Sequence, residues 1–139
     1  MTVLFTVPIP PFGKQRPRHN RRTGVTYTPI ETKKHERMIA EAYKALYDAL
    51  CFDESAFLRV EVTAYYPIPK SASKRKRTQM LMGEIRPTVK PDWDNVGKLI
   101  TDALNGVAYP DDKQIVTALI NKQYAVVPRM EIRITDELD

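Results

Sequence analysis

Two kinds of hydrophobic periodicity alternate along the chain, and they constrain the fold more than any other feature. Residues 31–50 repeat apolar side chains at helical spacing, whereas residues 58–64 alternate apolar and polar side chains as a half-buried strand does. A second helical stripe covers 96–104, and Gly106 stands where a glycine commonly ends a helix. Shorter strand-like runs lie at 2–8, 114–125 and 130–135. This order predicts an α/β fold, a mixed β-sheet with flanking helices.

The apolar positions of these segments are the candidate core. In the first helix they are His35, Met38, Ile39, Ala42, Ala45, Leu46, Ala49 and Leu50. In the central strand they are Leu58, Val60, Val62 and Ala64. In the second helix they are Val96, Leu99, Ile100, Ala103 and Leu104.

A length of 139 residues suits one small domain that spans 1–139. The single cysteine, Cys51, excludes an internal disulfide and fits a reducing cytosol. The apolar N-terminus is short and lacks the basic region of a signal peptide, and no apolar run approaches the roughly 20 residues that span a bilayer. We therefore expect a cytoplasmic protein without a membrane segment.

The net charge of +5 is unevenly distributed. Residues 1–90 hold 17 Lys and Arg against 8 Asp and Glu, while residues 91–139 hold 5 against 9. This asymmetry indicates a surface that binds a polyanion beside an acidic site, although scattered charges that keep the chain soluble would give the same totals.

Two short stretches carry most of the positive charge. Residues 8–29 read as a long loop or an irregular hairpin, with Lys14, Arg16, Arg18, Arg21 and Arg22. The second stretch is Lys74, Arg75, Lys76 and Arg77, on a short helix capped by Ser71 or Ser73. Such residues contact phosphates without reading base sequence, so nucleic acid is the expected partner, although charge runs are often only solvated faces. Tyr27 would either stack on a base or be buried at the end of the loop.

The carboxylates gather in "KPDWDNVGKLITDALNG" and "YPDDKQ". In an extended backbone Asp92 and Asp94 would project to the same side, with Trp93 opposite and available for packing. Two such acids repel unless they share a cation, and hard oxygen ligands favour Mg²⁺ or Mn²⁺. A return strand after the helix would bring Asp111 or Asp112 back beside this pair.

Other interpretations of the same residues stay open. Asp94 is a good N-cap, and Asp92 and Asp111 each follow a proline, as turn residues do. Lys98 lies on the polar face of the second helix, where it would either pair with Asp102 or meet a phosphate. The sequence contains no phosphate-binding glycine loop and no nucleophile elbow, so hydrolysis would rely on metal-activated water.

The order D-x-D-N-x-x-K followed by D-D resembles the signature of the RusA-type Holliday-junction resolvases. The segments "GKQRPRHNRRTGVTYTP" and "PKSASKRKR" are also similar to members of that family, so the resemblance extends from about Pro10 to Gln123. It implies Asp92, Asp94 and Asp112 as metal ligands, and Lys98 as a catalytic lysine. It also implies that Asn95 is the asparagine of the family motif.

The resemblance further implies a RusA-like fold, a homodimer, dependence on Mg²⁺ and paired incisions across a four-way DNA junction. It implies a bacterial or phage-encoded protein. Two other functions remain open: a nuclease for other branched DNA such as flaps and forks, or a non-catalytic DNA-binding recombination accessory protein whose acids are only caps.

Overall fold

A computed structural model describes residues 1–138. Its main sheet has four strands in the order β1–β6–β4–β5. These strands are β1 (Thr2–Val7), β4 (Leu58–Pro67), β5 (Ile115–Ala125) and β6 (Arg129–Thr135). β6 pairs antiparallel with β1 and β4, and β4 pairs parallel with β5, so the sheet is mixed, as the sequence predicts.

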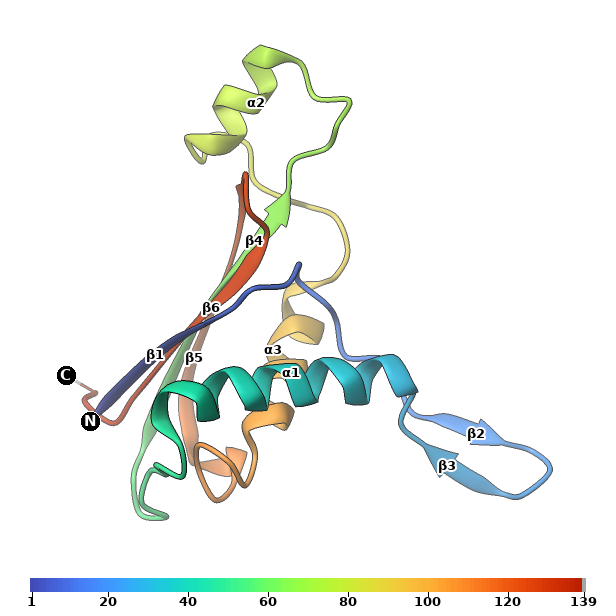
Figure 1. The fold of residues 1–139 in the computed structure, drawn as a ribbon, viewed down its shortest axis with the longest axis vertical. Helices are drawn as coiled ribbons and strands as arrows, with labels where there is room; N and C mark the ends of the chain where they lie inside the picture. Colours follow the sequence, from blue (N-terminus) through green and yellow to red (C-terminus); the bar gives the residue numbers. More distant parts are fainter. Residues whose placement is uncertain (139) are drawn as a thin grey trace.

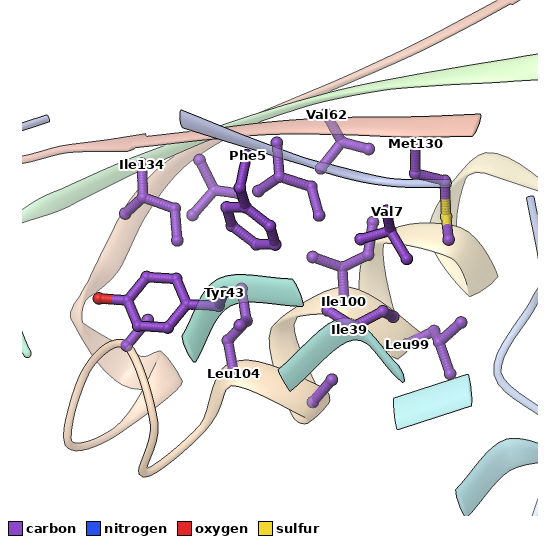
Figure 2. Close-up of a cluster of buried hydrophobic side chains, with 14 of the residues drawn as sticks. Phe5, Val7, Ile39, Tyr43, Val62, Leu99, Ile100, Leu104, Met130 and Ile134 are labelled. Atoms are coloured by element: carbon purple, nitrogen blue, oxygen red, sulfur yellow. The ribbon is translucent and has the colours of Figure 1, made fainter. Parts of the chain in front are cut away.

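Two helices, α1 (Ile30–Tyr47) and α3 (Trp93–Leu104), cover one face of this sheet (Figure 1). The strand side chains that face them are buried, including Phe5, Val62 and Ile134 (Figure 2). The opposite face of β4 carries Arg59, Glu61 and Thr63, as its alternating pattern predicts. The result is a two-layer α/β fold with one core.

Two basic segments stand away from this core. A small hairpin of β2 (Arg18–Asn20) and β3 (Val25–Tyr27) projects from one end of the molecule, and α2 (Lys74–Leu81) lies at the other end (Figure 1). Of the two serines considered as caps, Ser73 is the N-cap of α2, because its hydroxyl accepts the N–H of Lys76. Residues 8–29, for which the sequence predicts a long loop or an irregular hairpin, thus contain a short β2–β3 hairpin flanked by loop segments.

Of the three α-helices, α3 separates its apolar and polar residues most clearly onto two faces. Its five predicted core residues are all buried, and they pack between α1 and the sheet. Gly106, with φ 75, follows the helix in the left-handed conformation that favours glycine. A short 3₁₀ helix, η1 (Asp112–Gln114), then leads into β5.

The buried face of α1 differs from the predicted one. Thr32, Ile39 and Tyr43 are buried, whereas Leu46 is 66% exposed. The helix also ends at Tyr47, so the last two predicted core positions, Ala49 and Leu50, lie outside it and are exposed. The apolar spacing was compatible with two faces, and packing of Tyr43 against Phe5 selects one of them.

This difference gives a direct test of the core. Ile39→Ala removes a fully buried side chain and should lower the free energy of unfolding by about 2–5 kcal/mol. Leu46→Ala, at a position that the sequence also assigned to the core, should change it by less than about 0.5 kcal/mol. Urea unfolding followed by circular dichroism measures both, and equal losses would contradict the observed face of α1.

Candidate active site

The N-terminal end of α3 is held against the sheet just before the first two candidate acids. The Tyr66 hydroxyl on β4 donates a hydrogen bond to the carbonyl oxygen of Pro91. Burial raises the pKa of Tyr66 to about 12, and the nearby charge of Asp92 adds to this effect. The hydroxyl therefore stays protonated as a donor, and it anchors the residue that precedes Asp92.

The prediction that Asp92 and Asp94 project to the same side assumed an extended backbone, and this backbone is extended at Asp92 but helical from Trp93 onward. α3 begins at Trp93, so Asp92 is its N-cap residue and Asp94 lies in its first turn. Asp92 lines a hollow of about 400 Å³ with Phe12 and Lys90. Asp94 lines a neighbouring hollow of about 580 Å³. Asn95 borders both hollows, so the two hollows adjoin each other at this residue.

Neither carboxylate serves as a helix cap. Asp92 occupies the N-cap position without a side-chain hydrogen bond, and Asp94, which the alternative interpretation made the cap, is inside the helix. Within residues 1–138, neither one takes part in an ion pair. Both are exposed to solvent. They are therefore available to bind a cation.

Residues 12–15 are wedged between α1 and the start of α3. A Cβ atom on Gly13 would lie 2.9 Å from Pro91 Cβ and 3.1 Å from Asn95 Cβ, so this contact requires glycine. The Phe12 ring stacks on His35 of α1 with centroids 3.7 Å apart. The amide of Lys14 donates to the carbonyl oxygen of Asn95 at 2.9 Å. The base of the β2–β3 hairpin is thus fixed to both helices.

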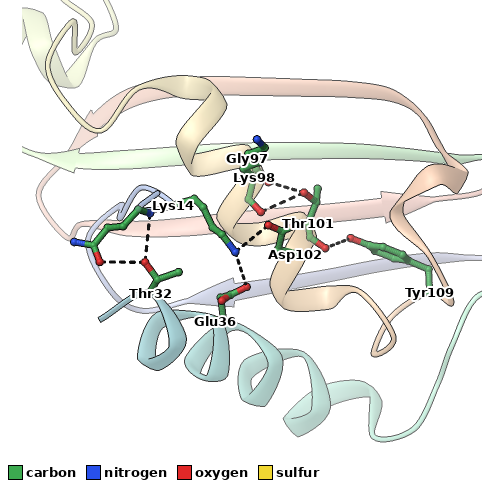
Figure 3. A network of polar contacts seen from close by, with 9 residues as sticks. Lys14, Thr32, Glu36, Gly97, Lys98, Thr101, Asp102 and Tyr109 are labelled. Carbon is green, nitrogen blue, oxygen red and sulfur yellow. Dashed lines mark hydrogen bonds and ion pairs between the residues drawn. The ribbon is translucent and has the colours of Figure 1, made fainter. Parts of the chain in front are cut away.

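Lys14 occupies an internal ion-pair network. Its ammonium lies 3.0 Å from Asp102 on α3 and 3.5 Å from Glu36 on α1 (Figure 3). Desolvation alone would lower the pKa of Lys14, but the hydrogen bonds and charges of Asp102 and Glu36 outweigh it and raise the pKa. The prediction that Lys14 contacts DNA is not tested by this arrangement, yet its charge is already shared between two carboxylates.

Lys98 is the unpaired cation of the same helix. Asp102, its potential partner four residues later, is bonded to Lys14 instead. Within residues 1–138 Lys98 has no ion-pair partner, and it lines the hollow that Asp94 lines. The sequence allowed two interpretations of Lys98, an ion pair with Asp102 or a contact with a phosphate. The ion pair with Asp102 is not formed.

The second acidic pair divides into a turn residue and a partly buried carboxylate. Asp111 caps η1 and accepts the amide of Lys113 at 3.0 Å, which lowers its pKa. The amide of Asp112 donates to Asn105 Oδ1 at 3.2 Å. Burial raises the pKa of Asp112, and the nearby acids Asp111 and Asp102 raise it further. Asp111 thus has the turn role that its position after Pro110 allows.

Asp112 does not return to the first two acids. It lies beside Asn105, just past the end of α3, and the helix rises roughly 16 Å along its axis between Asp94 and Asn105. Ligands of one Mg²⁺ sit only about 2.0–2.1 Å from the ion. Within residues 1–138, no three His, Cys, Asp or Glu side chains lie close enough together to hold a metal ion. The residues of one chain therefore do not fit the expected three-acid site.

The two basic segments lie on either side of α3 and are exposed. In the hairpin the exposed cations are Arg16, Arg18, Arg21 and Arg22, and in α2 they are Lys74, Arg75, Lys76 and Arg77. Tyr27 is 44% exposed, so its burial at the end of the loop is not observed. The structure thus leaves these side chains free to meet a ligand.

The family model described as endodeoxyribonuclease RusA matches residues 8–135. The chain therefore belongs to the RusA endodeoxyribonuclease family, and the resemblance seen in its sequence motifs is confirmed. Members of this family are hydrolases that cut within DNA strands. A curated relative from Bacillus subtilis (strain 168), named "Uncharacterized protein YqaN", is 35% identical over 141 residues, with 96% of each chain covered.

None of the helices in residues 1–138 is long and apolar enough to cross a membrane.

Sequence reasoning missed several residues around the site. Glu36 and Asp102 hold Lys14, and Tyr66 holds Pro91, across separations of 22, 88 and 25 residues. No local pattern marks such pairs. The glycine in "FGKQ" was the one signal of a close backbone approach at this point.

The Lys14 network can be tested through stability. Lys14→Met leaves the carboxylates of Asp102 and Glu36 without their cation, and it should lower the free energy of unfolding by about 1–2 kcal/mol. Because folding raises the pKa of Lys14, its contribution is complete below about pH 10.4 and is lost as pH rises through the folded value.

Chemical denaturation at pH 7 and again above pH 11 measures this contribution. The gap between the wild type and Lys14→Met should narrow at the higher pH. Lys113→Met, at an exposed lysine that forms no ion pair within residues 1–138, is the control and should change little. A Lys14→Met protein as stable as the wild type at pH 7 would show that the network contributes nothing.

Proposed function

We propose that this protein is a metal-dependent, structure-selective endodeoxyribonuclease that resolves four-way Holliday junctions in recombination and repair. The observation that carries this proposal is the exposed end of α3 in a basic chain of the RusA family, where Asp92 and Asp94 neither cap the helix nor form ion pairs with any of residues 1–138. Its setting is the cytoplasm of a bacterium or of a phage-infected cell.

The charge distribution supports DNA as the substrate. The β2–β3 hairpin and α2 place exposed cations on both sides of α3, so a backbone that crosses the molecule would meet phosphate-binding groups before and after the acids. An acidic patch alone would repel DNA. Surrounding cations offset that repulsion and bring a phosphodiester to the acids.

The cofactor we propose is Mg²⁺, with Mn²⁺ as a substitute, held by Asp92, Asp94 and Asp112. When bound, it would supply a Lewis acid for the scissile phosphate and lower the pKa of a bound water. Lys98 has a different role in this proposal. Its free ammonium shares the hollow with Asp94 and would hold the phosphate and stabilise the charge that develops on it.

A homodimer is part of the proposal, because one chain does not bring the three acids together. Asp112 lies at one end of α3, and Asp92 and Asp94 lie at the other. A two-fold axis can place the C-terminal end of α3 in one protomer near the N-terminal end in the other. Each of two sites would then draw acids from both chains, and two such sites suit paired incisions in a four-way junction.

The activity test uses a synthetic four-way junction and a linear duplex of matched sequence, each incubated with and without Mg²⁺. The wild type should cut the junction only with metal. Asp92→Asn and Asp112→Asn should each abolish cleavage while binding is retained, because each removes a ligand and a charge that repels DNA. Asp111→Asn should keep most of the activity, because Asp111 only caps η1.

Mixing the two inactive variants tests the division of the acids between chains. Heterodimers of Asp92→Asn and Asp112→Asn would have one site with both substitutions and one intact site, so the mixture should regain nicking of one strand. A mixture that stays inactive, with subunit exchange confirmed, would mean that each site draws its acids from a single chain. Cleavage by Asp92→Asn alone at the wild-type rate would refute its role.

This design also separates the alternatives. Equal or faster cutting of a flap or fork would make other branched DNA the substrate. Tight binding of the junction without cleavage at any metal concentration would support the alternative of a non-catalytic accessory protein.

A salt titration tests the basic helix. If α2 contacts phosphates, alanine at Lys74, Arg75, Lys76 and Arg77 should flatten the dependence of log affinity on log salt by about 0.9 for each contact that is lost. The control removes four exposed charges from α1 instead: Lys33, Lys34, Arg37 and Lys44. Equal flattening by both variants would show a general effect of net charge rather than a contact through α2.

A further inference from the structure

The single tryptophan of the chain is exposed at the proposed active site. Trp93 is the first residue of α3 and stands between Asp92 and Asp94, and its side chain is 62% exposed. The sequence pattern placed it opposite the two acids and available for packing, and the structure leaves it exposed. Tryptophan is highly buried on average, so an exposed indole between two free carboxylates calls for a function.

The surroundings of Trp93 combine an apolar wall with positive charge. It lines the same hollow of about 580 Å³ as Asp94 and Lys98. Ala118 and Ile120 of β5 provide apolar surface, and Arg16, at the base of the hairpin, adds a second cation. A flat aromatic surface beside free cations is complementary to a nucleotide, whose base stacks on the ring and whose phosphate meets the positive charge.

The position of Trp93 shows that the fold does not need it. The buried residues of α3 are Val96, Leu99, Ile100, Ala103 and Leu104, and Trp93 is not among them. The indole adjoins Asp94 in sequence and shares its hollow, so a base stacked there would lie close to the phosphate that the acids address. The contact would form only with a base whose face is free.

We propose that Trp93 stacks on a nucleobase displaced from its helical stack beside the scissile phosphate, and that this contact selects branched DNA. The inference rests on the proposed nuclease function and adds a basis for its selectivity. Inside a duplex both faces of each base are covered, and extracting a base is costly, least so for one already unpaired. A branch point supplies such a base, whereas an intact duplex does not.

Two substitutions at Trp93 test the stacking contact. Trp93→Ala should weaken binding to the junction by about 10-fold or more, and Trp93→Phe should retain much of it. The ratio of junction to duplex cleavage should fall in Trp93→Ala. Phe57→Ala is the control: Phe57 is 67% exposed just before β4, and its loss should change neither quantity.

The stacking contact can also be removed from the DNA side. A junction with abasic sites at the nucleotides that flank the cut keeps its phosphates and loses the stacking surface. It should bind the wild type as weakly as Trp93→Ala binds the normal junction. Trp93→Ala should lose little more on the abasic junction, since both changes remove one contact.

Fluorescence provides a readout without cleavage, because Trp93 is the only tryptophan in the chain. With Ca²⁺ in place of Mg²⁺, the junction should quench its emission and the matched duplex should not. A shift in emission that follows protein concentration alone, with no response to the junction, would place Trp93 in a contact between two copies and overturn the proposal. Unchanged selectivity in Trp93→Ala would also overturn it.

The outcomes distinguish this inference from the proposed function. Quenching by the junction in a protein that cuts no DNA would refute the nuclease and retain the stacking site. Junction cleavage that is insensitive to Trp93→Ala would retain the nuclease and refute the stacking site.

Discussion

The burial of one side of α3 against the sheet is the constraint on which the site depends. The five residues of its apolar stripe, Val96 to Leu104, are fully or almost fully buried, and Gly97 lets the helix approach β5 so closely that an added Cβ would lie 3.2 Å from Ile120. With this side fixed, the opposite side of the helix must face solvent. Asp94, Lys98 and Asp102 follow one another along that side at four-residue spacing, so the core determines where these charges lie.

Some of the carboxylates around α3 are paired with a lysine, whereas others are not. Lys14 binds Asp102 and Glu36 at the junction of three segments, and this joins the hairpin base to both helices. Asp92 and Asp94 receive no such cation from the described part of the chain. Both are exposed and lie at the N-terminal end of the helix, where its dipole favours negative charge. A ligand cation would find these two carboxylates uncompensated.

The sequence was sufficient for features that depend on local pattern. The strand alternation of β4, the stripe of α3, its terminating glycine and a serine cap for α2 were all predictable, because each is set by residues close together in the chain, although the sequence left the cap open between Ser71 and Ser73. The family signature likewise lies in short motifs. Assigning the buried side of α1 failed, because two overlapping apolar stripes fit the helix and only packing against β1 chooses between them.

Properties of the site that depend on three-dimensional placement were not predictable in the same way. Once the helix begins at Trp93, successive side chains are rotated by about 100° around the helix axis. The two-residue alternation of an extended chain therefore no longer relates Asp92 to Asp94. Whether Asp112 returns to the first pair depends on the direction of β5 relative to α3. Asp102, one of the two ion-pair partners of Lys14, is 88 positions away in the chain, beyond the reach of any spacing rule.

The separation of Asp112 from Asp92 and Asp94 has a consequence for how such an enzyme would be controlled. In the proposed dimer neither protomer contains a complete set of acids, so an isolated chain could bind DNA through its basic segments without cutting it. Completion of the sites would require the two-fold partner, and the same axis would complete both sites together. A junction offers two strands related by a similar two-fold axis, so the geometry that completes the sites would also direct them to opposite strands. Cleavage would then be limited to complexes in which a dimer and a branched substrate are both present.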